Sequence, residues 1–568
     1  MYEKNENAAQ RKTYTGNIFD EGEKTRREEI LAGIPKEWRA LHRDGHIHIH
    51  DLDAYGYTYN CLTFDLLKNF PYKKFDGKNG LRAITGVFEH IKLLIAKVGN
   101  EQSGGMGFAN FDTDLAEIMV RIGVEDNVAN REVISSCLAN LIRWCSESHE
   151  RMGQVSYYVT LNIGLADSEL SRFVCESLLD EFMNSPADTI RPNIVFKVKD
   201  GVNLNEKDPN HYLLIKATVC TSKKMIPTYL LCDCEMDVKF DPRKLSVMGC
   251  RTRVVDDLFG EPGGIGRGNI DNISINLPRL ALEVDEEIEN ASVEEKIVRF
   301  KQKWMDIANI VKQILLDRYR KTLERTAADY PTVSNYQLWM EDFKADSDSE
   351  NVFRHGTLSF GFIGLSEAIE ILTGKRFYED DETLETAEEF IAFMRNYADQ
   401  CRNEHNLNFS LLATSGEQIS GRFEKCDEAR YKHAVMDKEF YTNSFHVNVD
   451  SGLGAFRKIE IEGKFHRYAN GGCITYVEMN EAPIGNEAAM LELIVFAIKA
   501  GVHYLGFNFK LDVCGDCDSI GIFDVCPECS SGNVIHFRRV SGYLEDVSYF
   551  THGKKGEEKI RTKNGGCC

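Results

Sequence analysis

The sequence predicts an α/β fold built as one continuous, barrel-like body. Short runs of strand-like residues alternate with helical or polar stretches, which is the pattern of strands linked by helices. The clearest of these runs are Val155–Ile163, Asn193–Val198 and Thr228–Cys232. The chain of 568 residues shows neither an internal repeat nor a long low-complexity linker, so nothing in it divides that body.

The composition is that of a globular protein and excludes several classes. Hydrophobic residues make up 43% and charged residues 28%, and the formal net charge is −21. This charge argues against general binding of nucleic acid or of an anionic membrane, while local positive groups could still bind a small anion. The polar N-terminus and the lack of a long apolar run predict a cytoplasmic protein without a membrane span.

Seventeen cysteines are spread along the chain. Without a signal segment, they predict reduced thiols and not a disulfide framework. We expect one metal site, one or two catalytic cysteines, and small buried hydrophobic residues at Cys137, Cys145 and Cys175.

The first candidate site follows a polar N-terminal arm, residues 1–45. His46–Asp53 alternates polar and apolar residues, which is the period of a half-buried strand and puts three imidazoles on one face. They could ligate a metal, or Asp51 and Asp53 could hold them in a hydrogen-bond network. The three histidines are His46, His48 and His50.

A helix and a glycine loop come next. Apolar residues at helical spacing predict a helix over Leu81–Val98 that ends at Gly99. The glycine-rich segment Gln102–Asn110 is either a cradle for a ligand or a simple connection.

Cys250 stands on a glycine-preceded turn within Leu245–Thr252. The glycines of Gly263–Asn269 lead into the strand-like Ile273–Leu277, but they lack the spacing and the strand–turn–helix setting of a dinucleotide site. A thiol on a tight turn beside a glycine-lined strand is suited to holding one sulfur at a substrate. Cys61, in contrast, lies among apolar and aromatic residues and on its own is typical of a core.

The second half of the chain continues the alternation. Ser292–Glu295 forms a capping box before a strongly amphipathic helix, which we interpret as core. Further strands are expected at four segments, the first leading into a helix near 367–372. These segments are 355–364, 406–412, 442–447 and 469–476.

Two Cys-x-x-Cys pairs near the C-terminus predict a metal site. Two such knuckles on facing turns supply four thiolates in a tetrahedral arrangement, which suits zinc, with iron as the main competitor. Four protein ligands leave no open position, so the metal is expected to be structural. The ligands are Cys514, Cys517, Cys526 and Cys529.

Gly542 lies between bulky neighbours in the run His536–Leu544, directly after these pairs. One interpretation is that it turns the chain. The other is that it carries a stable radical. Glycine lacks a Cβ, so its α-carbon radical can flatten and delocalise into both flanking peptide groups.

In their joint order, these motifs resemble the anaerobic (class III) ribonucleoside-triphosphate reductases. The resemblance runs from about His48 to about Lys563. It implies a ten-stranded α/β barrel of two antiparallel halves, each of five parallel strands, with two loops meeting inside. The barrel would span 46–510, a zinc segment 511–532, and a glycyl radical loop with its tail 533–568. The motifs are Cys61, Met248–Arg251, Gly266–Asn269, the four metal cysteines and Arg539–Leu544.

The resemblance also implies a role for each matched residue. Gly542 would store the radical and take a hydrogen atom from Cys250, whose thiyl radical would abstract the 3′-hydrogen of a ribonucleotide. Cys61 would donate a proton and hydrogen from the other side of the ribose as water departs. Asn269 would bind the substrate. Met248 matches the branch in which formate, oxidised to carbon dioxide, supplies the electrons.

The partners implied by the resemblance are a radical-SAM activase with an iron–sulfur cluster, ribonucleoside triphosphates, effector nucleotides and a second copy of the chain in a homodimer. The segment His48–Asp51 comes too early for a complete ATP-cone before it. The terminal pair Cys567 and Cys568 could pass electrons from a redoxin, or it could be an exposed tail without catalytic duty.

Two other interpretations remain open. A glycyl radical enzyme of the pyruvate formate-lyase type would share the radical loop, but such enzymes use two adjacent cysteines in mid-chain and lack the zinc knuckles. A zinc-ribbon interaction protein with an inert barrel would leave Gly542 and Cys250 without a role.

Overall fold

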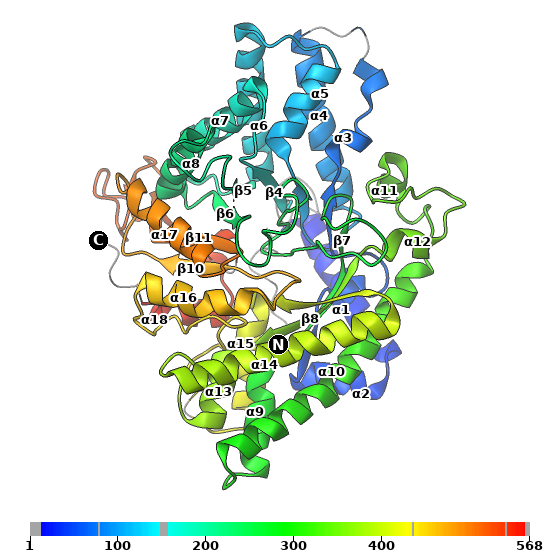
Figure 1. The fold of residues 1–568 in the computed structure, drawn as a ribbon, viewed down its shortest axis with the longest axis vertical. Coiled ribbons are helices and arrows are strands. Elements are labelled where there is room, and N and C mark those ends of the chain that lie inside the picture. Colours follow the sequence, from blue (N-terminus) through cyan, green and yellow to red (C-terminus); the bar gives the residue numbers. More distant parts are fainter. Residues whose placement is uncertain are drawn as a thin grey trace.

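Ten strands surrounded by helices form the centre of the computed structural model (Figure 1). The structure describes residues 13–75, 77, 80–147, 157–433, 435, 437–539 and 542–562. Within these residues the ten strands follow one path of hydrogen-bonded neighbours. In spatial order they are β10 (Thr475–Glu478), β11 (Tyr504–Asn508), β6 (Thr228–Leu231), β5 (Asn193–Val198), β4 (Val159–Ile163), β3 (Met106–Phe108), β2 (Cys61–Phe64), β7 (Gly268–Asn276), β8 (Thr357–Ile363) and β9 (Asn408–Ala413).

Strand directions divide this path into two halves. Strands β2 to β6 run parallel to one another, and so do β7, β8 and β9 on one side and β10 and β11 on the other. The halves meet antiparallel where β2 pairs with β7 and where β6 pairs with β11. The sequence-based expectation of two antiparallel, five-stranded halves is therefore confirmed.

The two ends of the path also meet, which closes the barrel. The Gly471 amide donates to the carbonyl of Leu411 (2.8 Å), and the Ala413 amide donates to the carbonyl of Gly472 (3.0 Å). These bonds join β9 to the segment that leads into β10 in a parallel bridge. Closure leaves the barrel without open edge strands and surrounds an interior that loops can enter.

Helices cover the outside of the barrel, with α4 to α8 around one half and α9, α10, α13 and α14 around the other (Figure 1). In chain order, the helices up to β6 are α1 (Tyr14–Gly33), α2 (Lys36–Asp44), α3 (Leu66–Asn69), α4 (Gly80–Gly99), α5 (Phe111–Arg121), α6 (Val128–Ser146), α7 (Glu169–Asn184) and α8 (His211–Lys224). Those after β7 are α9 (Leu277–Glu287), α10 (Val293–Leu323), α11 (Pro331–Tyr336), α12 (Ser349–Phe353), α13 (Leu365–Thr373), α14 (Asp381–His405), α15 (Glu417–Glu428), α16 (Ala455–His466), α17 (Glu487–Lys499) and α18 (His552–Ile560). Short 3₁₀ turns are η2 (Leu52–Ala54), η3 (Tyr72–Phe75) and η5 (Val547–Tyr549).

A second, smaller sheet of four antiparallel strands carries the C-terminal motifs. Its order is β13 (Ile520–Gly521), β12 (Leu511–Cys514), β14 (Val534–Arg539) and β15 (Leu544–Asp546). Strand β12 follows barrel strand β11 after two residues, so the small sheet continues directly from the barrel wall.

Several local expectations are confirmed. The helix expected over 81–98 is α4, and the capping box at Ser292 and Glu295 begins α10, with both reciprocal contacts present. The strands expected at 193–198 and 355–364 are β5 and β8. Cys145 and Cys175 are buried, whereas Cys137 is only partly buried.

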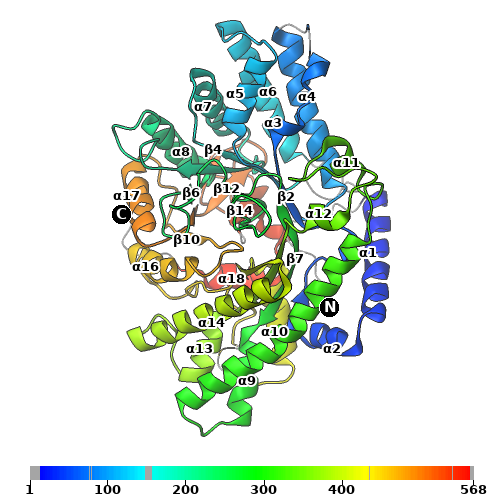
Figure 2. The same cartoon turned by 45° about the vertical axis from the view of Figure 1, so that its right-hand side comes forward.

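The structure adds detail to one expectation and contradicts another. The described part of the expected N-terminal arm forms α1 and α2, which lie beside α10 (Figure 2). The strand expected at 442–447 is wrong. This segment is buried, but two of its amides bind carboxylates: the Thr442 amide donates to Glu367 (3.2 Å) and the Val447 amide to Glu462 (3.0 Å). The His446 amide donates within the segment, to the carbonyl of Asn443 (2.9 Å).

Among the described residues, none of the helices combines the length and the apolar character needed to cross a membrane.

Candidate active site and four-cysteine centre

Two loops from distant parts of the chain meet inside the barrel. The first connects β6 to β7 and carries Cys250 at the tip of a hairpin, where Met248 and Thr252 exchange two backbone hydrogen bonds of 3.1 Å. Gly249 has a φ of +60°, a conformation that glycine adopts without the Cβ clash of other residues. The second loop connects β14 to β15 and carries Gly542. We call it the Gly542 loop.

Gly542 packs directly against Cys250. A methyl carbon placed on Gly542 would lie 2.4 Å from the Cβ of Cys250 and 2.7 Å from its Cα. Both distances are far below van der Waals contact, and the nearer atoms are fixed by the backbone. Only glycine therefore fits at this position without moving one of the two loops.

Cys61 is the second thiol of the site and lies on β2. Its Sγ donates to Oδ1 of Asn60 (2.7 Å) and accepts the Gly105 amide (3.3 Å). A carbon added to Gly104 would lie 2.7 Å from this sulfur. The glycine loop that the sequence left open as a cradle or a connection thus packs around a thiol.

A cavity of about 120 Å³ brings both thiols to one space. Cys61 and Cys250 line it, together with Gly105, Tyr543 and the Ser415 segment that precedes α15. In the first half of the barrel the lining residues Cys61, Gly105 and Tyr158 stand at or just before the starts of β2, β3 and β4, whereas Ser415 follows the end of β9.

Burial keeps both thiols protonated. It raises the pKa of Cys61 to about 12, and burial together with the carboxylate of Glu417 raises the pKa of Cys250. The Cys250 sulfur also lies 3.0 Å from the hydroxyl of Ser415. A thiol can give up a hydrogen atom, whereas a thiolate cannot, so this environment suits hydrogen-atom chemistry more than nucleophilic attack.

Met248 and Asn269 lie next to the cavity but do not line it. Met248 packs with Cys61 and Val254, and its sulfur is 3.6 Å from the Thr63 hydroxyl. Asn269 pairs with Cys61 across β2 and β7, its amide nitrogen donates to residues of β7 and β8, and its Oδ1 has no hydrogen-bond partner among the described residues. Asn272, three residues further on, lines the cavity instead.

Aromatic stacking holds Tyr543, the residue after Gly542. Its ring stacks on Tyr158 (centroids 5.3 Å apart), and the Arg191 guanidinium lies 5.0 Å from the ring centre. Arg191 also donates to the Leu544 carbonyl (3.2 Å). Sequence reasoning missed Tyr158 and Arg191, because neither stands in a motif and both meet Tyr543 only through the fold.

Arg539 fixes the other side of the Gly542 loop. Its buried guanidinium donates to the carbonyl oxygens of Gly542 (3.3 Å), Phe507 (3.2 Å) and Met225. Its backbone amide donates to Oδ1 of Asn508 (3.3 Å). The arginine thereby ties the loop to barrel strand β11. Its position three residues before Gly542 is the feature of the sequence that could have indicated this role.

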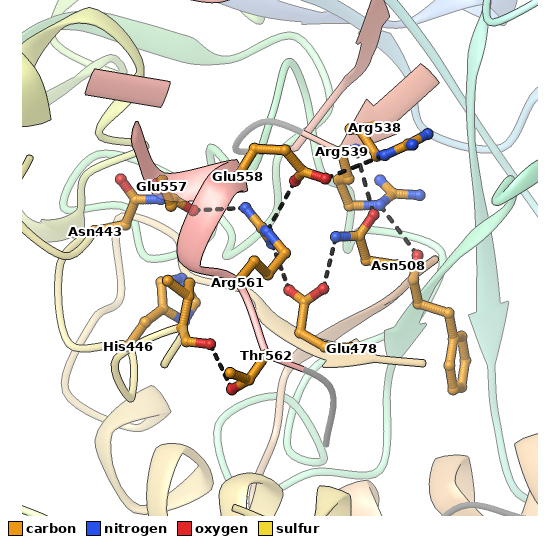
Figure 3. A network of polar contacts seen from close by, with 12 residues as sticks. Asn443, His446, Glu478, Asn508, Arg538, Arg539, Glu557, Glu558, Arg561 and Thr562 are labelled. Carbon is orange, nitrogen blue, oxygen red and sulfur yellow. Dashed lines mark hydrogen bonds and ion pairs between the residues drawn. The ribbon is translucent and has the colours of Figure 1, made fainter. Parts of the chain in front are cut away.

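A polar network behind the loop fastens α18 to the barrel (Figure 3). Arg561, at the end of α18, binds Glu478 of β10 (2.6 Å), Glu557 (2.6 Å) and Glu558 (3.2 Å). Glu558 also binds Arg538 of β14 (3.1 Å). The helix that follows the Gly542 loop is thus held by charges on both sheets.

The four predicted metal cysteines come together at the end of β12. Their sulfurs lie within 4.8 Å of one another, with Cys514 3.5 Å from Cys529 and Cys517 3.5 Å from Cys526. Tetrahedral zinc with Zn–S bonds of about 2.3 Å separates its sulfurs by roughly 3.8 Å. The cluster therefore fits a four-thiolate zinc ion, which leaves no position for a substrate.

The three N-terminal histidines do not gather as metal ligands in the described structure. His46 binds Glu283 (2.7 Å) and His50 binds the hydroxyl of Ser274 (2.8 Å). The hydrogen-bond interpretation is thus favoured, with partners other than the expected Asp51 and Asp53. His50 and Asp51 line the thiol cavity. The terminal Cys567 and Cys568 lie outside the described residues.

Comparison with known proteins agrees with this arrangement. A family model described as anaerobic ribonucleoside-triphosphate reductase matches residues 6–563. The chain is 30% identical to the anaerobic ribonucleoside-triphosphate reductase of Escherichia coli K12 over 95% of its own length and 81% of that protein's. It is 28% identical to the enzyme of that description from Enterobacteria phage T4, over 94% and 92% of the two chains.

A solved structure has the same fold. The anaerobic ribonucleotide reductase from Thermotoga maritima, solved in complex with dATP and CTP, superposes with a TM-score of 0.69 at 16% identity, over 96% of this chain and 90% of that one. On the match that spans nearly the whole sequence, this chain is an oxidoreductase that belongs to the anaerobic ribonucleoside-triphosphate reductase family.

Proposed function

We propose that this protein reduces ribonucleoside triphosphates to 2′-deoxyribonucleoside triphosphates by a radical that moves between Gly542 and Cys250. The observation that carries the proposal is the contact of these two residues at a cavity that also exposes Cys61. A buried, water-poor interior protects such a radical from side reactions.

The reaction starts when a radical-SAM activase has removed one hydrogen atom from the α-carbon of Gly542. Cys250 then gives its thiol hydrogen to that carbon and becomes a thiyl radical, which abstracts the 3′-hydrogen of the ribose. The two residues are close enough for direct transfer, because Cys250 already touches the face of Gly542 on which a side chain would stand.

Cys61 acts on the 2′-hydroxyl from the other wall of the cavity. Its raised pKa keeps a proton available for the departing hydroxyl, which leaves as water. Cys250 finally returns the 3′-hydrogen to the product and regains its own hydrogen from Gly542, so the radical is stored again after each turnover.

Formate is the proposed reductant. Its oxidation to carbon dioxide supplies two electrons, so that ribonucleotide, formate and a proton yield deoxyribonucleotide, carbon dioxide and water. Met248 packs against Cys61 and is the residue proposed to lie beside formate. Asn269 lies behind the cavity wall, and its buried Oδ1, which has no partner among the described residues, is proposed to accept a hydrogen bond from a substrate hydroxyl once the wall opens to it.

The remaining partners follow from the family. The Thermotoga maritima relative was solved with dATP and CTP, and with dATP in its specificity site, so we propose that this chain also binds effector nucleotides. The homodimer is proposed on the family resemblance alone. Zinc held by the four cysteines would keep β12 and β14 in register beneath the Gly542 loop.

Turnover with labelled formate tests the function. Activated wild-type protein should form deoxynucleotide and labelled carbon dioxide in equal amounts. Cys250→Ala should lose activity by at least about 10³-fold, because Cys250 supplies the atoms nearest to the side-chain face of Gly542 in the described structure. Turnover with a redoxin in place of formate would favour the terminal cysteines as the electron route. Retained turnover in Cys250→Ala would remove that residue from its role.

A further inference from the structure

A second cavity lies outside the catalytic one and has a different character. It encloses about 450 Å³ between α1, α2, β1 (Ile47–Ile49), α15 and the start of α18, and it shares no lining residue with the thiol cavity. Its lining includes four permanent cations and a single carboxylate, in a protein whose net charge is −21. The cations are Arg27, Arg43, Arg422 and Lys425, and the carboxylate is Glu28. We call it the basic cavity.

Part of this positive charge is already compensated. Glu28 binds Arg43 (2.6 Å) at an exposed position, and Arg27 binds Asp53 (3.4 Å) and Glu23 (3.7 Å). Glu28, the carboxylate that lines the cavity, is therefore already paired with Arg43. It does not compensate the two cations on α15, Arg422 and Lys425.

Arg422 and Lys425 form no ion pair with any described residue. Nη2 of Arg422 donates to the carbonyl of His42, while its Nη1 is buried and has no hydrogen-bond partner in the described structure. They lie three residues apart on α15, and both line the cavity. Burying an unpaired guanidinium is costly, so a protein normally supplies a carboxylate or binds an anion there.

An imidazole adds a further group without a partner. His48 is 4% exposed, lines the basic cavity, and its Nδ1 has no hydrogen-bond partner among the described residues. Its ring lies between those of His42 (centroids 5.4 Å apart) and His50 (4.8 Å). Since His50 lines the thiol cavity, the neighbouring imidazoles of His48 and His50 line different cavities.

We propose that the basic cavity binds a polyphosphate-bearing anion at a site separate from the thiol cavity. Arginine and lysine converging on one space are the groups that bind phosphate oxygens in proteins. A volume of about 450 Å³ exceeds the need of a single inorganic ion and lies within the range of small-molecule sites.

The position of the site gives it a consequence for the Gly542 loop. Helix α15 begins beside the thiol cavity with Glu417 and carries Arg422 into the basic cavity. Helix α18, which follows the Gly542 loop, crosses α15 where Gly421 and Gly553 touch, so that a carbon added to Gly421 would lie 2.8 Å from the Gly553 Cα. A bound anion would therefore link the N-terminal helices to the segment that holds the Gly542 loop.

Cys426 provides a local probe, because it lines the basic cavity and is partly exposed. The full-length protein, without activation, is treated with N-ethylmaleimide at constant ionic strength in the presence of inorganic tripolyphosphate or of ATP, and labelling of Cys426 is followed by peptide mass spectrometry. Saturable protection of Cys426 by at least fivefold is expected. Unchanged labelling with both compounds would overturn the proposal.

Variants connect the protection to the cations. Arg422→Gln and the more exposed Lys425→Gln should each raise the half-protecting concentration at least tenfold, whereas Arg457→Gln, an exposed arginine paired with Glu460 on α16, should not. Equal protection in wild type and Lys425→Gln would contradict the site even if Arg422→Gln failed to fold. If tripolyphosphate and ATP protect Cys426 with equal half-protecting concentrations, the phosphate chain itself is the ligand. If the half-protecting concentration of ATP is tenfold lower, the ligand is a nucleotide.

Discussion

At the scale of single residues, Gly542 meets two requirements at once. Its α-carbon can hold a delocalised radical, and its lack of a side chain lets the loop approach Cys250 where a carbon would lie 2.4 Å from that residue's Cβ. The sequence offered only the first argument. The second depends on a contact between residues far apart in the chain, which no local pattern predicts.

The protonation of Cys61 leads to a pH prediction. Because burial raises its pKa to about 12, the thiolate fraction of the folded protein should still rise about tenfold per pH unit between pH 9 and 10.5. Alkylation of Cys61 by iodoacetamide, measured by peptide mass spectrometry, should follow that rise. In urea-unfolded protein the rate should level off near pH 9, and a native rate that levels off there too would contradict the raised pKa.

At the scale of elements, α18 and the four-cysteine turn both adjoin the small sheet whose β14 and β15 flank the Gly542 loop. The two Cys-x-x-Cys pairs predicted a metal that would pin down this loop, but nothing in the sequence indicated the role of α18, because the segment after Gly542 is simply charged. The fold brings Arg561 against carboxylates of β10 and of α18 itself (Figure 3). The strand expected at 442–447 is absent for a related reason, since buried carboxylates bind the amides of Thr442 and Val447, at its two ends, in place of a ladder.

Loss of Arg561 should loosen the C-terminal segment. Arg561→Ala removes one cation from the buried carboxylates Glu478 and Glu557, of which Glu557 keeps Lys554 (2.6 Å), and loss of a buried ion-pair partner costs about 3 kcal/mol. Hydrogen exchange of β14 and β15 should accelerate, while that of β4 and β5 stays unchanged. The matched change Lys559→Ala, at an exposed position of the same helix, should have little effect, and equal exchange in both variants would contradict the network's role.

Metal removal should affect the same region. Each chain is expected to contain one zinc ion by atomic absorption, and Cys514→Ser should lose it, because a three-thiolate site binds zinc more weakly. Hydrogen exchange should then increase in β12 to β14 and not in the barrel. A protein without zinc that keeps wild-type exchange there would contradict a structural metal.

At the scale of the whole molecule, local sequence patterns predicted much of the architecture. The runs at 193–198 and 228–232 became barrel strands, and the alternation of strands and helices indicated an α/β body. Only the family resemblance predicted a barrel of two antiparallel halves. The structure shows the two antiparallel junctions and the closure between Leu411 and Gly471. Periodicity reports which face of a strand is buried, but it carries no information about which strand is its neighbour.

The site was predicted to a similar extent. The spacing of two Cys-x-x-Cys pairs predicted the four metal cysteines, and the family resemblance predicted Cys61, Cys250 and Gly542; the structure places the members of each set close together. It places Asn269 behind the cavity wall, where Asn272 is exposed to the cavity instead. Side chains such as Tyr158, which act only through a tertiary contact, left no signal in the sequence.

Electron paramagnetic resonance tests the central claim, that Gly542 stores the radical and Cys250 uses it. After anaerobic incubation with a radical-SAM activase, S-adenosylmethionine and reductant, the wild-type protein should show a doublet, split by the one hydrogen left on the glycine α-carbon. Cys250→Ala should keep the doublet and lose turnover, and Gly542→Ala should lose both. No doublet in the wild type, or a doublet that survives Gly542→Ala, would contradict the account.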